Sequence, residues 1–382
     1  MASHGRQFVV EARLLNGTIL IYGATGYTGR LIAKVASDRG AHPILAGRDL
    51  DKVKRVAEPL GLSARAFDLG DPARIDAAIK DVSVVLCAAG PFSATSRSMA
   101  DACLRNRVHY LDVTGEIDVF EALAARDAEA RARGVMLLPG VGFDVVPSDC
   151  LAAHLKRRLP DANELRLYLS LGANMSRGTA KTMIEAIAAG TRMRRKGRIV
   201  SRDRAEVGSC DFGECEKPTV QVSWGDVATA FHSTGIPNVD VHFEASPAIR
   251  AFARTPWFVK SFLGLNPMQR ILKSHVDRLP EGPSEANRRA GQAVLVGQAR
   301  NDRGQTVRSR MRTPEGYSLT AATAFDAACR VVAGEIKPGF HRCRDKAVDR
   351  VMLGELISQL GVALRFVRHD VRLAVQIIAD NL

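Results

Sequence analysis

A glycine-rich turn near the start of this chain, Gly23-Ala24-Thr25-Gly26-Tyr27-Thr28-Gly29, constrains its fold more than any other feature. The apolar, β-rich residues 19–22 precede the turn, and residues 30–39 follow it with a helical pattern. A strand, a tight glycine turn and a helix in this order form the phosphate-binding end of a dinucleotide-binding βαβ unit. We therefore expect a Rossmann-type domain in which six residues of the turn contact the cofactor: Gly23, Thr25, Gly26, Tyr27, Thr28 and Gly29.

The second predicted strand, residues 43–46, ends in Gly47-Arg48. Sites that take NAD(H) usually have Asp or Glu near this point, ~20 residues after the glycines, to hold the ribose hydroxyls. A guanidinium instead pairs with the 2′-phosphate of NADP(H) through charge-assisted hydrogen bonds. The sequence therefore predicts NADP(H) as the cofactor and Arg48 as a contact. In the alternative interpretation, Arg48 is a solvated loop residue and Asp49 contacts the ribose.

Strands and helices alternate as far as residue 149. Further strands are expected at residues 63–68, 82–88, 109–113 and 135–138, and helices at residues 72–80, 98–106 and 119–133. This alternation predicts an α/β fold with a doubly wound parallel sheet, which binds ligands at the carboxyl ends of its strands.

The pattern changes after residue 150. Helices are expected at residues 148–158 and 179–189, and antiparallel strands at residues 220–224, 239–243 and 293–297, after a first strand at 165–169. Residues 255–265 form either an apolar helix or a surface lid, and a helix at 319–334 returns to the first domain. We therefore divide the chain into an N-terminal extension (1–16), an NADP-binding Rossmann domain (17–149), an α+β substrate domain (150–315) and a C-terminal helical segment (316–382).

The composition is that of an ordinary globular protein, with 46% hydrophobic and 25% charged residues. No apolar run approaches the ~18 residues of a transmembrane helix, and the N-terminal residues do not resemble a signal peptide. Seven scattered cysteines without a C-x-x-C pair indicate neither a metal site nor a disulfide framework. We expect a cytoplasmic protein.

The formal net charge of +13 is concentrated most densely at residues 192–198, Arg-Met-Arg-Arg-Lys-Gly-Arg. Aromatic residues make up only 5% of the chain and none interrupts this run, so a nucleic-acid partner is not expected. Two interpretations stay open for the run. It is either a solvated loop at a helix end, or a contact for an acidic partner or the surface of a membrane.

Several motifs, in order, carry a family resemblance. They are residues 23–29, Leu-Ala-Gly-Arg at 45–48, Ala-Ala-Gly-Pro-Phe at 88–92, residues 109–116, 142–149 and 176–179, and a weaker match at 316–320. With them the chain resembles the saccharopine dehydrogenase-like family, in particular the branch of trans-acting enoyl reductases. The resemblance implies a nicotinamide-dependent reductase in which the strand ends of the Rossmann domain face a second domain. The run at 341–346 departs from the family pattern, which puts any family role of residues 341–382 in doubt.

Further cofactor contacts are expected where the fourth strand ends. The residues Ala88, Ala89, Gly90, Pro91 and Phe92 combine small side chains, which permit a close approach, with a wall for the nicotinamide ring. The alternative is a tight turn with a packed phenylalanine. Asp68 lies where such folds contact adenine, although it is equally suited to capping the next helix near Asp71.

The catalytic acid is not evident from the sequence. The Tyr-x-x-x-Lys pair of short-chain dehydrogenases is absent, because none of the five tyrosines has a lysine four residues later. Polar residues expected near the cleft include Thr114, and the weak candidates for the catalytic acid are Asp112, Glu116, Asp144 and Tyr317.

The turn Ser176-Arg177-Gly178-Thr179 is a candidate substrate contact. As the start of a helix it offers N–H groups and a guanidinium to an anion. The alternative is plain N-capping by Ser176.

Together these patterns predict an NADP(H)-dependent oxidoreductase that reduces a C=C or C=O bond of an acyl or lipid-like intermediate, small or carrier-bound. A saccharopine-type amino acid reductase is the enzymatic alternative, and it would need several basic groups for carboxylates. A non-catalytic NADP(H)-binding regulator or scaffold is the alternative from another class. A homodimer and peripheral contact with a membrane or an acidic partner are further expectations.

Overall fold

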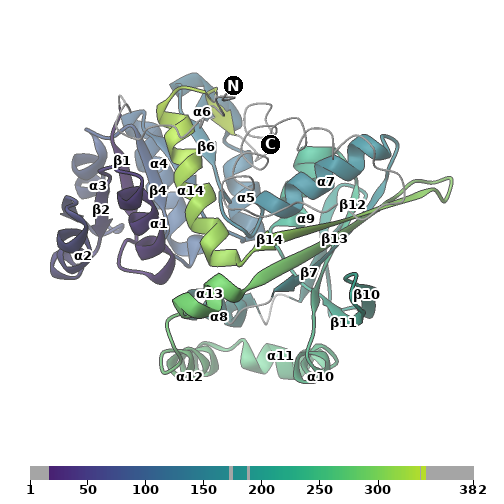
Figure 1. Cartoon of the computed structure of the whole chain (residues 1–382). Coiled ribbons are helices and arrows are strands. Elements are labelled where there is room, and N and C mark those ends of the chain that lie inside the picture. Colours follow the sequence, from purple (N-terminus) through teal and green to yellow (C-terminus); the bar gives the residue numbers. More distant parts are fainter. Residues whose placement is uncertain (1–16, 172–174, 187–189, 336, 341–382) are drawn as a thin grey trace, which may run out of the picture.

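The computed structural model describes residues 17–171, 175–186, 190–335 and 337–340, so the predicted extension at 1–16 and the atypical segment at 341–382 lie outside the described residues. Two β-sheets organise the described chain (Figure 1). One is a seven-stranded sheet with helices on both faces, and the other is a mixed sheet. The predicted fold class is confirmed.

All pairings in the first sheet are parallel, in the order β15-β6-β5-β4-β1-β2-β3. The central strands β1 (Ile19–Tyr22) and β4 (Val84–Cys87) are fully buried, as their continuous apolar sequences require. The other strands are β2 (Ile44–Gly47), β3 (Ala64–Ala66), β5 (His109–Asp112), β6 (Met136–Leu138) and β15 (Gly339–Phe340). The connecting helices are α1 (Tyr27–Asp38), α2 (Leu50–Ala57) with the short 3-10 helix η2 (Glu58–Leu60), α3 (Pro72–Ile79), α4 (Phe92–Asn106), α5 (Ile117–Ala124) and α6 (Asp127–Arg133).

Two helices in this half differ from the prediction. The helix expected at 98–106 begins at Phe92, because the carboxylate of Glu116 accepts hydrogen bonds from the first N–H groups of α4. The single helix expected at 119–133 is wrong. It is divided into α5 and α6 at Arg126, whose backbone leaves the helical conformation (φ −97°, ψ 10°). The break lets α5 pack against α4 while α6 packs against β6 and β15.

The second sheet has the order β10-β11-β12-β7-β13-β14, and a hairpin of β8 and β9 is attached to β12. Its central strand β7 (Glu164–Leu171) pairs with β12 (Asn238–Glu244) and β13 (Gln292–Arg300). The pairing of β12 with β7 is parallel, so the expectation of antiparallel strands is wrong here; the chain between these strands forms a long crossover. The remaining strands are β8 (Thr191–Arg195), β9 (Arg198–Arg202), β10 (Val207–Asp211), β11 (Glu216–Gln221) and β14 (Thr306–Pro314).

Helices join the two sheets into one core. α7 (Val146–Arg158) and α9 (Asp226–Thr234) pack on the second sheet, and α14 (Gly316–Val332) leads from β14 back to α1, β4 and β5. Buried residues of the first sheet, such as Ile21 and Leu111, belong to the same apolar cluster as Leu167 and Val241 of the second. The domain boundaries given above remain predictions, since this core is continuous across them.

A row of short helices lies along the lower edge of the molecule in Figure 1, outside both sheets. It contains α10 (Pro247–Ala253), α11 (Trp257–Leu263) and α12 (Asn266–Val276), and α13 (Glu285–Ala290) leads from it into β13. We call residues 247–279 the arm. Opposite α12 lies α8 (Arg177–Ala186), which follows the end of β7. Within the described ranges, no helix combines the length and the apolar character needed to cross a membrane.

Candidate active site

A groove of about 400 Å³ lies at the carboxyl end of the first sheet. It is lined by Gly23, Thr25, Gly26, Tyr27 and Thr28 of the glycine turn and by Gly47, Arg48, Ala88, Ala89 and Gly90 of the neighbouring strand ends. The sequence-predicted cofactor residues therefore come together in one place. Gly29, Asp68 and Pro91 are not among the lining residues, and Phe92 lines the adjoining pocket instead.

The glycines of the turn are required by close packing. Gly23 has a left-handed φ of +86°, and a Cβ atom on it would lie 2.7 Å from the backbone nitrogen of Ala89. A Cβ atom on Gly29 would lie 2.3 Å from the carbonyl oxygen of Gly23. The start of α1 and the ends of β1 and β4 thus pack too closely for side chains at Gly23 and Gly29. Because these positions carry no side chains, a ligand can approach the backbone of the turn.

Arg48 lines the groove, and within the described ranges no carboxylate forms an ion pair with it. The carboxylate of Asp49 is engaged instead. It accepts a hydrogen bond from the backbone N–H of Lys52 at 3.1 Å as the N-cap of α2, and this contact lowers its pKa. Arg48 thus lines the groove while Asp49 caps α2, and the contact of either residue with the cofactor stays a prediction.

Asp68 binds its own loop. Its carboxylate accepts a hydrogen bond from the N–H of Gly70 at 2.7 Å, while Asp71 caps α3. The alternative that Asp68 caps this helix is therefore wrong, because Asp71 caps it, and an adenine contact by Asp68 remains a prediction.

A strap formed by residues 279–283 crosses the glycine turn from the arm side. The hydroxyl of Tyr27 donates a hydrogen bond to the carbonyl of Pro283 at 2.6 Å, and a Cβ atom on Gly282 would touch the Tyr27 ring at 2.7 Å. Glu281 forms an ion pair with Arg30, and the nearby Asp277 forms one with Lys181 at 2.6 Å. Glu281, Asp277 and Lys181 all line the groove.

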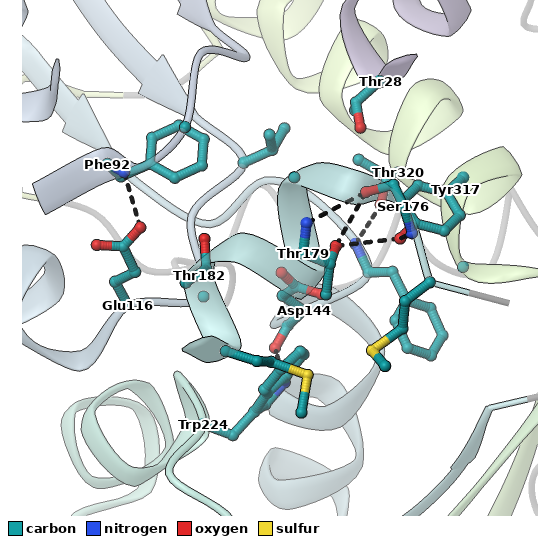
Figure 2. Close-up of a pocket in the computed structure, with 18 of the residues that line it drawn as sticks. Thr28, Phe92, Glu116, Asp144, Ser176, Thr179, Thr182, Trp224, Tyr317 and Thr320 are labelled. Carbon is teal, nitrogen blue, oxygen red and sulfur yellow. Dashed lines mark hydrogen bonds between the residues drawn. The ribbon is translucent and has the colours of Figure 1, made fainter. Parts of the chain in front are cut away.

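A second cavity of about 440 Å³ opens from the groove. Both share Thr28, Ala88, Gly90, Ser176 and Gly178 as lining residues. In Figure 2, Phe92 and Thr28 lie on one side of this pocket and Trp224 on the other. Apolar walls come from both halves of the molecule: Val113, Phe143, Leu171, Met175, Met183, Trp224 and Phe243. A dinucleotide in the groove would therefore present its nicotinamide end to an apolar pocket.

Most carboxylates around this pocket are engaged by the protein. Glu116 accepts the N–H groups of Phe92 and Ser93 at 2.7 and 2.8 Å, and Glu315 accepts those of Tyr317 and Ser318 at 3.0 Å each. Two further carboxylates form ion pairs, Asp118 with Arg192 at 2.8 Å and Glu185 with Lys273 at 2.6 Å. These four groups fix the walls of the pocket.

Asp112 lies behind the pocket and is fully buried. Its carboxylate accepts hydrogen bonds from the Tyr110 hydroxyl at 2.7 Å and from the N–H groups of Thr114 and Gly140 at 3.0 and 2.9 Å. Burial nevertheless raises its pKa to about 6. Thr114 in turn accepts the N–H of Glu116 at 3.0 Å. The arrangement suits a group that fastens the ends of β5 and β6.

Asp144 differs from the other acidic residues. It lines the pocket, and within the described part of the chain no hydrogen bond or ion pair reaches its carboxyl group. Enclosure by protein raises its pKa to about 7. Gly115 makes room for it, because a Cβ atom there would lie 2.9 Å from the Asp144 Oδ2. A carboxyl group in this setting holds a proton near neutral pH and has no protein acceptor for it.

Tyr317 and the α8 turn form the neighbouring wall (Figure 2). The Tyr317 hydroxyl accepts a hydrogen bond from the N–H of Ser176 at 2.6 Å and lies 3.0 Å from the Thr179 hydroxyl. Burial raises its pKa, and its ring packs edge-on against Tyr27 with centroids 5.1 Å apart. Tyr317 thus joins the glycine turn to α8.

Ser176 caps the start of α8, as the alternative interpretation of the Ser176–Thr179 turn predicts. The Ser176 hydroxyl accepts the N–H of Thr179 at 3.3 Å. Arg177 lines the cofactor groove and not the apolar pocket, and its Nε donates to the carbonyl of Leu279 in the strap. Any anion that meets Arg177 would therefore lie on the cofactor side.

Comparison with known proteins follows this geometry. Residues 19–138 match the family model of the saccharopine dehydrogenase NADP-binding domain. This segment is similar to the NADP-binding domain of saccharopine dehydrogenases. The predicted resemblance and the NADP cofactor class are confirmed.

Parts of the chain are also similar to curated proteins, and its fold is similar to that of a solved structure. The chain is 32% identical over 149 residues to a trans-acting enoyl reductase of Mycobacterium leprae. This alignment covers 37% of this chain and 36% of the relative. It is 30% identical over 184 residues to a putative trans-acting enoyl reductase of Mycobacterium tuberculosis, which covers 44% of each. The matches thus span less than half of these relatives. Apo saccharopine dehydrogenase (L-Glu forming) of Saccharomyces cerevisiae shares the fold, with a TM-score of 0.61 at 13% identity over 92% of this chain and 99% of that one.

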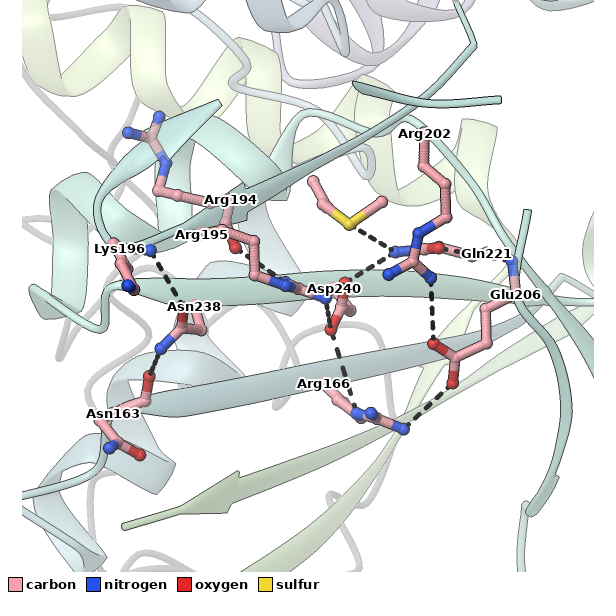
Figure 3. Close-up of polar contacts among 11 residues, drawn as sticks. Asn163, Arg166, Arg194, Arg195, Lys196, Arg202, Glu206, Gln221, Asn238 and Asp240 are labelled. Carbon is pink, nitrogen blue, oxygen red and sulfur yellow. Dashed lines mark hydrogen bonds and ion pairs between the residues drawn. The ribbon is translucent and has the colours of Figure 1, made fainter. Parts of the chain in front are cut away.

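The basic run at 192–198 is a hairpin of β8 and β9, so the expected loop at a helix end is wrong. Arg195 binds both carboxylate oxygens of Asp240 at 2.7 and 2.8 Å, as Figure 3 shows. Arg194 pairs with Glu121 of the NADP-binding domain, and Arg192 pairs with Asp118. The carboxylates that pair with these three arginines come from distant segments of the chain. The local sequence therefore does not indicate these ion pairs.

Sequence reasoning missed the wall supplied by the second sheet. Trp224 and Phe243 pack edge to face at 4.7 Å in the pocket, and Met175 and Met183 line its α8 side. Asp277 and Glu281 in the NADP groove were also missed. These residues reach the site through long-range pairing of β12 with β7 and of α8 with α12, for which no local motif is a signal.

Proposed function

We propose that the protein is an NADP(H)-dependent oxidoreductase that reduces a C=C or C=O bond of an acyl or lipid-like intermediate. One observation carries the proposal: the groove opens into an apolar pocket in which, among the described lining residues, one carboxyl group has no protein partner, that of Asp144. The NADP-binding family of residues 19–138 supports the oxidoreductase class.

The pocket favours a neutral, apolar substrate. Arg192 is the only lysine or arginine among the described lining residues, and it is already paired with Asp118. A saccharopine-type substrate carries several carboxylates, which would lack cationic partners here. The names of the mycobacterial relatives support an enoyl group, and the term trans-acting supports a carrier-bound acyl chain as its source.

Reduction of an enoyl bond needs one hydride and one proton. NADPH, held by the glycine turn, Arg48 and Ala88–Gly90, would supply the hydride. Asp144 holds a proton at its carboxyl oxygen and would deliver it to the neighbouring substrate carbon, which completes the saturated product and leaves Asp144 as a carboxylate for water to reprotonate. The apolar walls, with Trp224 and Phe243 opposite the glycine turn, orient the acyl chain and exclude water.

The test is NADPH consumption with a medium-chain trans-2-enoyl thioester and with the matching 3-ketoacyl thioester, each followed by mass spectrometry of the product. We expect one of them to gain two hydrogens while NADPH is oxidised in equal amount. A saccharopine-forming mixture of lysine or glutamate derivatives should give no turnover. If NADPH binds tightly but neither acyl substrate is reduced, the regulator interpretation replaces this proposal.

A further inference from the structure

The arm exposes large apolar side chains in an unusual concentration. Six of the ten exposed large apolar residues in the described part of the chain lie in it: Ile249, Phe252, Phe262, Leu265, Ile271 and Leu279. Four of these, from Phe262 to Leu279, are between 51% and 55% exposed. Single exposed apolar residues are common on protein surfaces, but such a cluster marks an interaction surface.

The arm is also strongly basic. Its sequence from 247 to 279 contains one acidic residue, Asp277, and six basic ones: Arg250, Arg254, Lys260, Arg270, Lys273 and Arg278. Asp277 and Lys273 are each engaged in an ion pair with α8. Across the described ranges, no carboxylate forms an ion pair with Arg254, Arg270 or Arg278, and all three are exposed.

The arm adjoins the mouth of the apolar pocket. α12 packs against α8, and the Lys273–Glu185 ion pair joins the arm to a residue that lines the pocket. Two more of the ten exposed apolar residues, Met175 and Met183, lie on this α8 side of the pocket. Exposed apolar side chains therefore lie both on the arm and on the α8 side of the pocket, and α8 packs against the arm.

We infer that the arm binds the surface of an anionic phospholipid bilayer. Short helices that present apolar side chains together with arginines are suited to the boundary between headgroups and acyl chains, where the side chains insert and the cations meet phosphates. A second copy of the chain is disfavoured on this surface, because two such basic arms would repel each other. The row of helices along one edge of the molecule in Figure 1 can contact a flat surface along its length.

Binding to vesicles tests this inference without any substrate, so its outcome is independent of the proposed reaction. Purified protein is sedimented with vesicles of phosphatidylcholine alone and with vesicles that also contain phosphatidylglycerol. We expect binding only to the anionic vesicles, and a loss of binding as salt is raised. The triple variant Arg254→Glu, Arg270→Glu, Arg278→Glu should weaken binding by about 100-fold. The variant Phe262→Ser, Leu265→Ser, Ile271→Ser should lose it as well.

The matched control is Arg55→Glu with Val200→Ser, which changes an exposed charge on α2 and an exposed apolar residue on β9. It should bind vesicles like the unchanged protein. Retained NADPH binding in each variant shows that the fold is intact. The inference is overturned if the unchanged protein does not bind anionic vesicles, or if the arm variants bind them as tightly as the unchanged protein does. It is equally overturned if sedimentation shows a dimer that the arm variants dissociate.

Discussion

At the scale of single residues, Asp144 differs from its acidic neighbours because no hydrogen bond or ion pair of the described residues reaches its carboxyl group, and this is why we propose it as the proton donor. Glu116 and Asp112 lie nearby on the same sheet edge, but backbone N–H groups and Tyr110 occupy their oxygens. Asp112 lies in the predicted strand at 109–113, and Glu116 and Asp144 follow predicted strands, so the sequence placed all three at one end of the sheet. The sequence could not show which of them is the proton donor, because that depends on which carboxylates accept hydrogen bonds from backbone N–H groups in the folded chain.

For Asp144→Asn we expect kcat to fall by about 100-fold or more, with the Kd for NADPH unchanged. The high-pH limb of the kcat profile, expected near the raised pKa of about 7, should disappear. Because the folded state holds the proton more tightly than the unfolded chain, Asp144 lowers stability as pH rises from about 4 to 7. The variant should therefore be the more stable protein at pH 8, by up to about 4 kcal/mol.

Steady-state kinetics and thermal unfolding over a pH series measure both effects. Asp38→Asn, on the exposed face of α1, serves as the control and should change neither. An unaltered pH profile in the Asp144 variant would assign the proton to another donor, such as water.

Arg48 belongs to the same scale. Removing its guanidinium in Arg48→Ala should weaken NADPH binding by about 10- to 100-fold and leave NADH binding unchanged, because only NADPH carries the 2′-phosphate. Fluorescence titration with both nucleotides measures this, and Arg55→Ala on the exposed face of α2 is the control. Equal binding of NADH and NADPH by the unchanged protein would refute the role of Arg48.

At the scale of elements, the sequence located nearly every strand of the first sheet but misjudged two helices. The apolar runs at β1 and β4 are local signals, and so are Pro72 for α3 and the glycines for α1. The start of α4 depends on Glu116, which is 24 residues away in the chain. The break between α5 and α6 has neither glycine nor proline to mark it, and the parallel pairing of β12 with β7 depends on a long crossover.

The capping of α4 by a distant carboxylate makes a prediction about stability. Glu116→Ala should destabilise the protein by about 1–2 kcal/mol, because two N–H groups at a helix start lose their acceptor. It should also raise the Kd for NADPH, since α4 begins directly after the groove residues Ala88–Gly90. Chemical denaturation and nucleotide titration measure these effects. Glu164→Ala, exposed at the start of β7, should leave both values unaltered.

At the scale of the whole molecule, the two sheets share one apolar core, although the sequence suggests two domains. Ile21 of the first sheet and Leu167 of the second belong to the same buried cluster, and α14 connects β14 to α1. Composition and length cannot reveal that the core is shared, because a chain with the same number of apolar residues could equally form two separate cores.

We therefore expect a single cooperative unfolding transition. Circular dichroism, which follows both sheets, and tryptophan fluorescence, which follows only Trp224 and Trp257 of the second half, should give coincident curves. NADPH at 100 times its Kd should stabilise both halves together by about 2.7 kcal/mol. Two separate transitions, with only the first responsive to NADPH, would instead indicate independent domains.

Two carboxylates of the protein line the cofactor groove, one from the arm and one from the strap. Asp277 and Glu281 lie among its lining residues and are held by Lys181 and Arg30, on the same side as Arg177. Phosphates that bind Lys181 or Arg30 would therefore displace carboxylates that are already present, whereas within the described ranges no carboxylate pairs with Arg48. Such an exchange releases few counter-ions to solvent, so the cofactor would be retained across a wide range of ionic strength, while any contact made by the arm would weaken as salt rises.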